Sequence, residues 1–344
     1  MDYTFLKACR GEETDYTPIW IMRQAGRYLP EYHTVRDKVT FLELCKTPEL
    51  AAEVSIQPVE IVGVDAAIMF SDILVPIEKM GAPLEFREKQ GPVFPSPIRD
   101  QAAVDKLGIP DPEDDLGYVM DTIRILRKEL TGKAPLIGFS GAPFTLATYL
   151  IEGGSSRTFL NTKTMMYNDP GLYKSLMDKI TDCTTVYLKG QIAAGVQAIQ
   201  IFDSWVGVLA PCDFAEFALP YVNRIITELK KVSDIPIIYF ANNGATLIEQ
   251  SLTSGADVLG CDWRINLSDV VRRVDGRAAI QGNMDPLALF LPPDKLEKRI
   301  ANVLAEAKGA KGHIFNLGHG IVQQTDPAKA KLAVELVHKL SRKS

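Results

Sequence analysis

The chain has few cysteines, and their spacing excludes two classes of protein. Among 344 residues there are five, and no two of them form a CxxC pair. An odd number of dispersed cysteines indicates reduced thiols, so we expect neither a disulfide framework nor a zinc ribbon. The four histidines are dispersed as well, and we therefore expect no metal site. These residues are Cys9, Cys45, Cys183, Cys212, Cys261, His33, His313, His319 and His338.

The chain also lacks an excess of positive charge and a long apolar run. Its formal net charge is −5, which gives no support to nucleic-acid binding, so any anion site must come from a local cluster of cations. No apolar run reaches the length that spans a membrane, and the first residues lack the basic and apolar regions of a signal peptide. We therefore expect a cytoplasmic protein without nucleic-acid or membrane partners.

Short apolar runs alternate with longer segments of helical periodicity along the whole chain. The runs are almost continuously apolar, which is typical of parallel strands buried on both faces. The pattern predicts an α/β fold of TIM type, a single-domain (β/α)8 barrel over residues 1–344. A doubly wound open sheet is the alternative, but it needs a GxGxxG turn after the first strand, and the chain has Arg-Gln-Ala-Gly-Arg there. The predicted strands are 18–22, 65–69, 135–140, 198–202, 236–241, 257–261, 278–282 and 313–317.

The segments between these strands refine the prediction. Several of them have acidic starts and basic or glycine ends, as helices do. The interval between the second and third strands is long, and within it residues 84–96 predict a hairpin that turns at Gln90-Gly91-Pro92. We expect this hairpin to be an excursion from the barrel. The predicted helices are 112–130, 169–194, 213–232, 294–308 and 326–342.

Polar residues follow the predicted strands at the points where the strands end. In a barrel of parallel strands these ends meet at one face, where active sites lie. Many polar residues at such positions only cap helices, and we assign Asn243 and Asp285 mostly to that role. Asp72 and His319 are harder to explain in this way. The other strand-end residues are Ser71, Ser140, Asp203, Ser204, Trp205, Asn242, Asp262, Trp263 and Asn283.

Arginines are concentrated just beyond the first predicted strand. Arg23 and Arg27 are four residues apart, and Arg36 lies nine residues further on. Guanidinium groups keep their charge at any accessible pH and bind carboxylates with two parallel hydrogen bonds. Such a cluster at a strand end suits a multiply anionic substrate. The structural alternative is a solvated loop in which these arginines pair with Glu31 and Asp37.

Five motifs, in order along the chain, resemble those of the uroporphyrinogen decarboxylase family. They are MRQAGRYLPEY, FSDIL, GFSGAPFTLATYLIEGG, QGNMDP and FNLGHG, and the resemblance covers essentially the whole chain. It implies a carboxy-lyase that removes the carboxyl groups from the four acetate side chains of uroporphyrinogen III, giving coproporphyrinogen III in haem biosynthesis. It also implies a single distorted (β/α)8 barrel, a homodimer, and no metal or organic cofactor.

The resemblance implies roles for individual residues. Arg23 and Arg27 flank the reacting acetate, Arg36 holds substrate carboxylates, and Asp72 meets the central pyrrole N–H groups. Asp72 and Arg23 are therefore the candidate catalytic residues. His33 departs from the family pattern, which often has a basic residue there; a histidine that is mostly neutral at pH 7 would weaken one outer contact. The further candidate substrate-binding residues are Gln24, Ala25, Gly26, Tyr149, Phe202, Ser204 and His319.

The chemistry of decarboxylation explains why these residue types are needed. Loss of the carboxyl group leaves an electron pair on the former acetate methylene, and cofactor enzymes use a bound electron sink to accept it. Here a pyrrole protonated at the ring carbon next to the side chain would accept the pair, and the Asp72 carboxylate would stabilise that cation. The structural alternatives are a cap or ion pair for Asp72, a packed loop residue for His319 and a core position for Tyr149.

Two other functions compete with this hypothesis. Zinc- and cobalamin-linked methyltransferases of the same superfamily bind zinc through a His-x-Cys pair after the fifth strand and a later cysteine. The chain has Ala-Asn-Asn-Gly there, without His or Cys. The second competitor is a non-catalytic tetrapyrrole-binding protein. Asp72 together with Arg23 counts against it, because carboxylate binding alone requires no acid at the centre of the ring.

Overall fold

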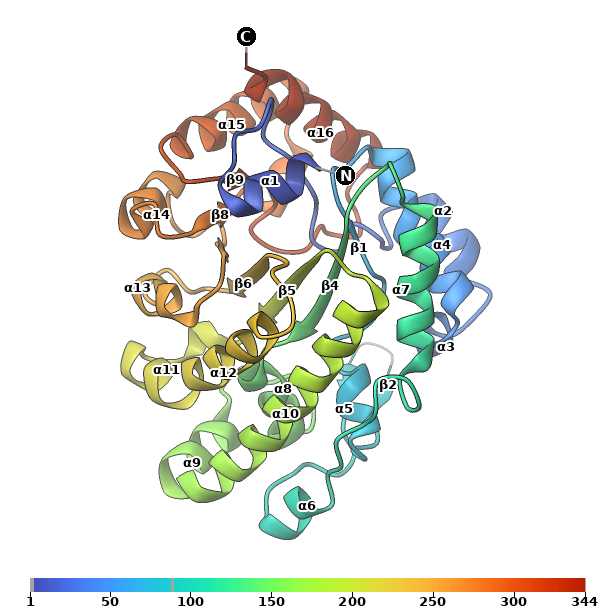
Figure 1. The fold of residues 1–344 in the computed structure, drawn as a ribbon, viewed down its shortest axis with the longest axis vertical. Helices are drawn as coiled ribbons and strands as arrows, with labels where there is room; N and C mark the ends of the chain where they lie inside the picture. Colours follow the sequence, from blue (N-terminus) through green and yellow to red (C-terminus); the bar gives the residue numbers. More distant parts are fainter. Residues whose placement is uncertain (1–2, 88–89, 344) are drawn as a thin grey trace.

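Seven parallel strands form one curled sheet at the centre of the molecule (Figure 1). The computed structural model describes residues 3–87 and 90–343. The strands pair in the order β1-β4-β5-β6-β7-β8-β9, and every pair is parallel. They confirm seven of the predicted strands. Their bounds are β1 (Ala67–Ile68), β4 (Leu136–Gly141), β5 (Ala198–Asp203), β6 (Ile237–Ala241), β7 (Val258–Gly260), β8 (Ala279–Gln281) and β9 (His313–Ile314).

The first predicted strand closes the barrel without forming a regular strand. Ile19 makes an isolated parallel bridge to Phe315, just after β9, and its carbonyl oxygen accepts the amide of Asp65, just before β1. Other amides of this segment donate to side chains: Ile19 to the Asp65 carboxylate at 2.7 Å, and Met22 to Asn316 Oδ1 at 3.1 Å. A ladder cannot continue where side chains take the backbone donors. The sheet and this segment together confirm the TIM-type fold.

The helices surround the curled sheet (Figure 1), and local chemistry sets their ends. The 25-residue helix α10 begins where the Asp169 carboxylate accepts the amide of Leu172 at 3.1 Å, and it ends at the left-handed Gly195. The helices are α1 (Thr4–Arg10), α2 (Pro30–Arg36), α3 (Phe41–Lys46), α4 (Pro48–Gln57), α5 (Val75–Lys79), α6 (Gln101–Asp105), α7 (Gly117–Glu129), α8 (Pro143–Glu152), α9 (Leu160–Asn168), α10 (Pro170–Ala194), α11 (Pro211–Phe217), α12 (Leu219–Lys230), α13 (Ile248–Ser251), α14 (Leu267–Val274), α15 (Pro293–Glu306) and α16 (Pro327–Ser341).

Two of the predicted helices differ from the structure. The segment 213–232 is divided into α11 and α12, because Pro220 at the start of α12 lacks the amide that would continue α11. The segment 112–130 becomes helical only at Gly117. The Asp111 carboxylate accepts the amides of Glu113 and Asp114, which holds the preceding acidic residues in a turn.

The predicted hairpin is present, as β2 (Glu85–Arg87) paired antiparallel with β3 (Gly91–Val93). Of the three predicted turn residues, Gln90 lies in the turn, whereas Gly91 and Pro92 belong to β3 and pair with Arg87 and Phe86. Residues 88–89 lie outside the described part of the chain. Phe94 donates its amide to Gly153 at the end of α8, so the excursion packs against the helix that carries Tyr149.

Hydrogen-bonded polar side chains cross the interior of the barrel. Trp20 Nε1 donates to Gln281 Oε1 at 2.8 Å, and Gln281 Nε2 donates to Gln200 Oε1 at 3.2 Å. All three residues are fully buried, and they join the closing segment, β8 and β5. A connected buried network stiffens its surroundings, and the interior is therefore a packed core that supports the face above it.

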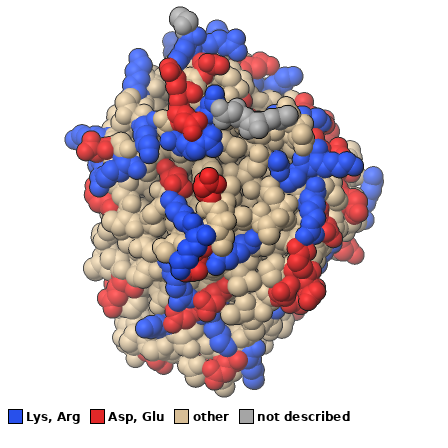
Figure 2. All heavy atoms as spheres, viewed as in Figure 1, with Lys and Arg blue, Asp and Glu red and all other residues tan. Residues whose placement is uncertain are grey.

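The surface carries no broad area of a single charge on the side that Figure 2 shows, where basic and acidic residues are interspersed. Within residues 3–87 and 90–343, no helix has both the length and the apolar character needed to cross a membrane.

Candidate active site at the mouth of the barrel

Asp72 lies in the loop between β1 and α5, at the carboxyl end of the barrel. Its Oδ1 accepts the amide of Leu74 at 2.9 Å, and this is the one hydrogen bond to its carboxylate among the described residues. The side chain is half-buried. Burial raises the pKa of Asp72, and the Leu74 amide and the positive charge of Arg23 oppose that rise. Asp72 therefore holds the turn before α5 and is not its cap, because the N-cap of α5 is Leu74 and lacks a side-chain cap. The rest of its carboxylate capacity is free.

Arg23 lies where the closing segment leaves the barrel, in a left-handed conformation (φ 63°). Its side chain is exposed and runs across Gly320: a Cβ on that glycine would come within 2.4 Å of Arg23 Cδ. The Arg23 charge lowers the pKa values of both Asp72 and His319. The structure therefore brings together three residues that are far apart in the sequence.

His319 is half-buried between two glycines that permit close packing on both sides. A Cβ on Gly318 would lie 2.5 Å from the Trp263 backbone nitrogen, while Gly320 faces Arg23. Burial lowers the pKa of His319 to about 4, and the charges of Arg23 and Arg264 act in the same direction. The imidazole is therefore neutral at pH 7, and it can offer a ligand a hydrogen bond but not a positive charge.

An aromatic wall stands beside these groups. Tyr149, in the last turn of α8, lies 6.2 Å from the Trp205 ring, and burial raises its pKa. The charges of Asp72 and Arg23 also act on the Tyr149 hydroxyl, while its half-buried ring packs against the core. Phe202, in β5, packs edge-to-face on Phe139 at 5.8 Å and is partly exposed.

Ser204 follows directly after β5 and is half-buried. Its carbonyl oxygen accepts Asn242 Nδ2 at 3.0 Å. This bond joins the loops that follow β5 and β6, and it fixes the backbone that carries Ser204.

The other two arginines lie further out. Arg27 is exposed, and Arg36, at the end of α2, donates to the Val39 carbonyl oxygen. No ion pair to a carboxylate is recorded for either of them in the described residues. His33 lies 3.3 Å from Asp37 and 3.1 Å from the Arg27 carbonyl oxygen. The arginines are thus not held by Glu31 and Asp37, and His33 contacts Asp37 instead.

The side chain of Gln24 fixes the loop that carries Arg23 and Arg27. Its side chain is fully buried, with Oε1 accepting the Ile21 amide at 3.0 Å and Nε2 donating to the Ala66 carbonyl oxygen at 2.9 Å. Gly26 allows the tight turn, because a Cβ there would come within 2.9 Å of the Arg23 carbonyl oxygen. Ala25 lies half-buried between them. The Gln24 amide also donates to the Ile21 carbonyl oxygen at 2.9 Å, so this residue supports the loop from beneath and is not exposed to a ligand.

The sequence did not point to Arg264, and it did not show that Asp203 is buried. Arg264 follows Asp262 and Trp263 after β7, and its guanidinium lies 4.0 Å above the Trp263 ring. Asp203 is a strand-end carboxylate, but it is fully buried and accepts the hydroxyls of Thr145 at 2.7 Å and Tyr239 at 2.8 Å. Burial raises the pKa of Asp203 to about 6. Arg264 could have been found because it directly follows the strand-end residues Asp262 and Trp263. Nothing in the local sequence shows that Asp203 is buried.

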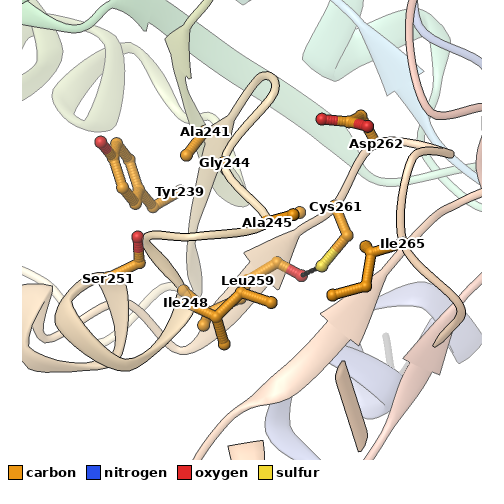
Figure 3. Close-up of a pocket in the computed structure, with 11 residues that line it drawn as sticks. Tyr239, Ala241, Gly244, Ala245, Ile248, Ser251, Leu259, Cys261, Asp262 and Ile265 are labelled. Atoms are coloured by element: carbon orange, nitrogen blue, oxygen red, sulfur yellow. Dashed lines mark hydrogen bonds between the residues drawn. The ribbon is translucent and has the colours of Figure 1, made fainter. Parts of the chain in front are cut away.

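A small enclosed cavity lies behind the mouth, between β6, β7 and α13 (Figure 3). Its volume is about 20 Å³, which is enough for one water molecule. Cys261, Ile265 and Ala245 line it together with other, mostly apolar residues (Figure 3). It is too small for a macrocyclic substrate.

A parallel barrel with a carboxylate and several arginines at the carboxyl ends of its strands defines the class of TIM-barrel enzymes that act on anionic substrates. Residues 2–340 match the family model described as uroporphyrinogen decarboxylase (URO-D). The chain belongs to this family.

Similar curated proteins extend over the whole chain. A uroporphyrinogen decarboxylase of Desulfotalea psychrophila is 64% identical over 343 residues, and one of Geobacter metallireducens is 53% identical, each alignment covering 100% of both chains. A uroporphyrinogen decarboxylase of Carboxydothermus hydrogenoformans is 50% identical over 341 residues, covering 99% of this chain and 97% of the relative.

Solved structures share the fold at much lower identity. A methyltransferase from Methanosarcina mazei superposes with a TM-score of 0.81 and 18% identity, covering 98% of this chain and 99% of the other. A B12-independent methionine synthase from Shewanella gives 0.59 and 11%, covering 88% and 91%. In the part of the chain that the structure describes, no group of three or more His, Cys, Asp or Glu residues is placed to hold a metal ion.

Proposed function

We propose that this chain is a carboxy-lyase that converts uroporphyrinogen III to coproporphyrinogen III by removing the carboxyl groups of its four acetate side chains. Family membership over residues 2–340 supports this function. The observation that carries it is that Asp72 and Arg23 lie on the same face at the mouth of the barrel, where the Arg23 charge lowers the pKa of Asp72.

The reaction needs a proton, an electron sink and a place for carbon dioxide to leave. Protonation of a pyrrole ring carbon beside the acetate creates a cation that spreads to the ring nitrogen. The bond between the methylene and the carboxyl carbon then breaks, its electron pair flows into the cationic ring, and carbon dioxide departs. Protonation of the resulting exocyclic methylene gives a methyl group, and loss of the added ring proton restores the pyrrole.

Asp72 and Arg23 would act at the two ends of this electron flow. The Asp72 carboxylate accepts pyrrole N–H groups and stabilises the cation, because a fixed charge in a half-buried site interacts more strongly than one in water. Arg23 holds the reacting carboxylate beside it. Without substrate, burial raises the pKa of Asp72, and N–H donors from the substrate would favour its ionised form.

The remaining residues would bind and orient the macrocycle. Arg27 and Arg36 hold outer carboxylates, Phe202 packs on the ring, and the loop backbone at Gln24, Ala25 and Gly26 shapes the rim. Tyr149, Ser204 and the neutral His319 supply hydrogen bonds. We also propose that the protein is a cytoplasmic homodimer that works without a metal or organic cofactor.

The direct test is anaerobic incubation of the purified protein with uroporphyrinogen III, with the carboxyl groups of the products counted by chromatography. We expect stepwise loss of the acetate carboxyl groups and release of carbon dioxide. Binding without release of carbon dioxide would instead indicate a tetrapyrrole-binding protein. Activity should survive exhaustive dialysis against a chelator, and stoichiometric zinc whose removal abolishes turnover would favour the methyltransferase-like alternative. Sedimentation of the same sample tests the dimer.

A further inference from the structure

The loop that carries His319 lies between two arginines from different parts of the chain. On one side, the Arg23 side chain runs across Gly320, and on the other the Asp262–Trp263 backbone packs against Gly318. The charges of Arg23 and Arg264 both act on the His319 ring. Arg264 therefore belongs to the same face as the candidate catalytic residues.

The guanidinium of Arg264 is held in place, but most of its N–H donors remain free to bind a ligand. It stacks 4.0 Å above the Trp263 ring, and its Nη1 lies 3.3 Å from Asp262 Oδ1. That carboxylate is already occupied, because Oδ1 accepts the Arg264 amide at 2.8 Å and Oδ2 accepts the Asn243 amide. The Arg264 side chain is 44% exposed, whereas that of Asp262 is 2% exposed. A planar cation with several free donors thus faces solvent in a fixed orientation.

The position of Arg264 complements the other arginines. Arg23, Arg27 and Arg36 all come from the segment that closes the barrel and the helix after it. Arg264 follows β7, which is separated from the closing segment by β8 and β9. A macrocycle with carboxylates around its whole rim needs cations on more than one side of the mouth, and the closing segment supplies only one side.

We propose that Arg264 is a further substrate-binding residue, which holds a rim carboxylate of the macrocycle on the β7 side of the mouth. This assignment rests on the proposed function. It makes Asp262 and Trp263 positioning residues, which orient the guanidinium without contacting the substrate.

The test compares Arg264→Gln with a matched control, Arg272→Gln. Arg272 lies on α14, its side chain is 75% exposed, and it pairs with Asp269 at 2.7 Å, so the control removes one exposed, ion-paired arginine away from the mouth. We expect Arg264→Gln to raise KM about five- to tenfold, since the lost contact is charge-assisted but partly exposed. We expect kcat to change little, because the carboxylate in question does not react. The Kd of the oxidised, fluorescent porphyrin should rise with KM, and its dependence on salt should weaken.

Arg264→Lys separates charge from geometry, since lysine keeps the charge but not the planar stack; it should restore part of the affinity. Unchanged KM and Kd in Arg264→Gln, as in the control, would overturn the assignment. A lower unfolding midpoint and lower kcat with unchanged Kd would also overturn it, because Arg264 would then only brace Asp262. Absence of turnover in the parent protein would instead overturn the proposed function itself.

Discussion

Asp65 and Asp72 stand at opposite ends of the short strand β1, and the structure surrounds them differently. Asp65 lies at the base of the barrel and accepts three hydrogen bonds, from the Tyr16 hydroxyl at 2.9 Å, the Ile19 amide at 2.7 Å and His338 Nε2 at 2.7 Å. These contacts join the closing segment and the helix α16 to the sheet. The hydrogen-bonding capacity of this carboxylate is therefore used to hold the fold together.

Asp72 lies at the mouth, and the structure gives it only the amide of Leu74 as a hydrogen-bond partner within the described ranges. The nearby Arg23 has no recorded hydrogen bond from its side chain in those ranges. Charged side chains that lack hydrogen-bond partners cost stability, and folded proteins keep them mainly at sites that a ligand completes. The comparison teaches that the carboxylate at the base is fully used by the fold, whereas the charged groups at the mouth keep hydrogen-bonding capacity free, as the proposed substrate site requires.

The largest effect is expected for Asp72→Asn, which keeps the shape of the side chain and removes its charge. If the carboxylate stabilises a protonated pyrrole, turnover should fall by at least ~10²-fold, by analogy with the loss of one preorganised electrostatic group. Binding should change less than turnover. Steady-state kinetics and porphyrin binding measure the two effects separately. A folded variant with near-parental turnover would show that Asp72 only holds the turn before α5.

Asp203 sharpens the comparison, because it lies at the mouth end of β5 and yet is fully buried and paired. Its pKa of about 6 in the folded protein exceeds the value of roughly 3.9 for an unfolded chain. Between these values the folded state binds more protons, so stability falls as pH rises and is constant above about pH 6. Ionisation of Asp203 should therefore lower the free energy of unfolding by roughly 3 kcal/mol between pH 4 and pH 6, at about 1.4 kcal/mol per pKa unit.

Denaturant unfolding of the parent and Asp203→Asn at several values between pH 4 and pH 7 measures this contribution. The Asn variant does not titrate, so it should lack this component of the pH dependence, and the difference in stability between the two proteins should shift in its favour as pH rises. Parallel pH profiles would mean that Asp203 ionises normally in the folded state.

Much of the barrel could be predicted from the sequence because its signals are local. Near-continuous apolar runs located seven strands. The prediction of a regular first strand was wrong, because the amides of Ile19 and Met22 donate to the side chains of Asp65 and Asn316. Those partners are remote in sequence, and no periodicity reports them.

The site was harder to predict for the same reason. Gln24 lies between the arginines in the sequence, but its side chain points inward to the Ala66 carbonyl oxygen. Asp203 and Asp262 both follow apolar strands, and only their tertiary partners show that they are buried. The place of Arg264 at the mouth follows only from the tertiary structure, in which the close contacts of Gly318 and Gly320 put the His319 loop between Arg264 and Arg23.

At the base, Asp65→Asn should cost stability and leave the chemistry intact. The variant loses charge-assisted bonds from Ile19 and His338, and we expect the free energy of unfolding to fall by about 2 kcal/mol. The kcat of the folded fraction should match the parent, because the mouth is at the other end of β1. Thermal unfolding and active-site-normalised kinetics measure both. A selective loss of kcat without a loss of stability would break the division between base and mouth.

The smallest effects are expected for Arg27→Lys and Arg36→Lys, which keep the charge at the mouth and change only its geometry. Lysine cannot reproduce the planar, two-pronged contact with a carboxylate, so each variant should raise KM on the order of tenfold, which corresponds to about 1.4 kcal/mol. Rising salt should enlarge the deficit, because the remaining contact is a screened point charge. Arg36→Lys should in addition lose a little stability, since Arg36 also donates to the Val39 carbonyl oxygen, whereas Arg27 donates no side-chain hydrogen bond recorded within residues 3–87 and 90–343. Steady-state kinetics at two salt concentrations distinguish these outcomes from the alternative, in which both variants behave like the parent and both arginines are surface charges without a role in binding.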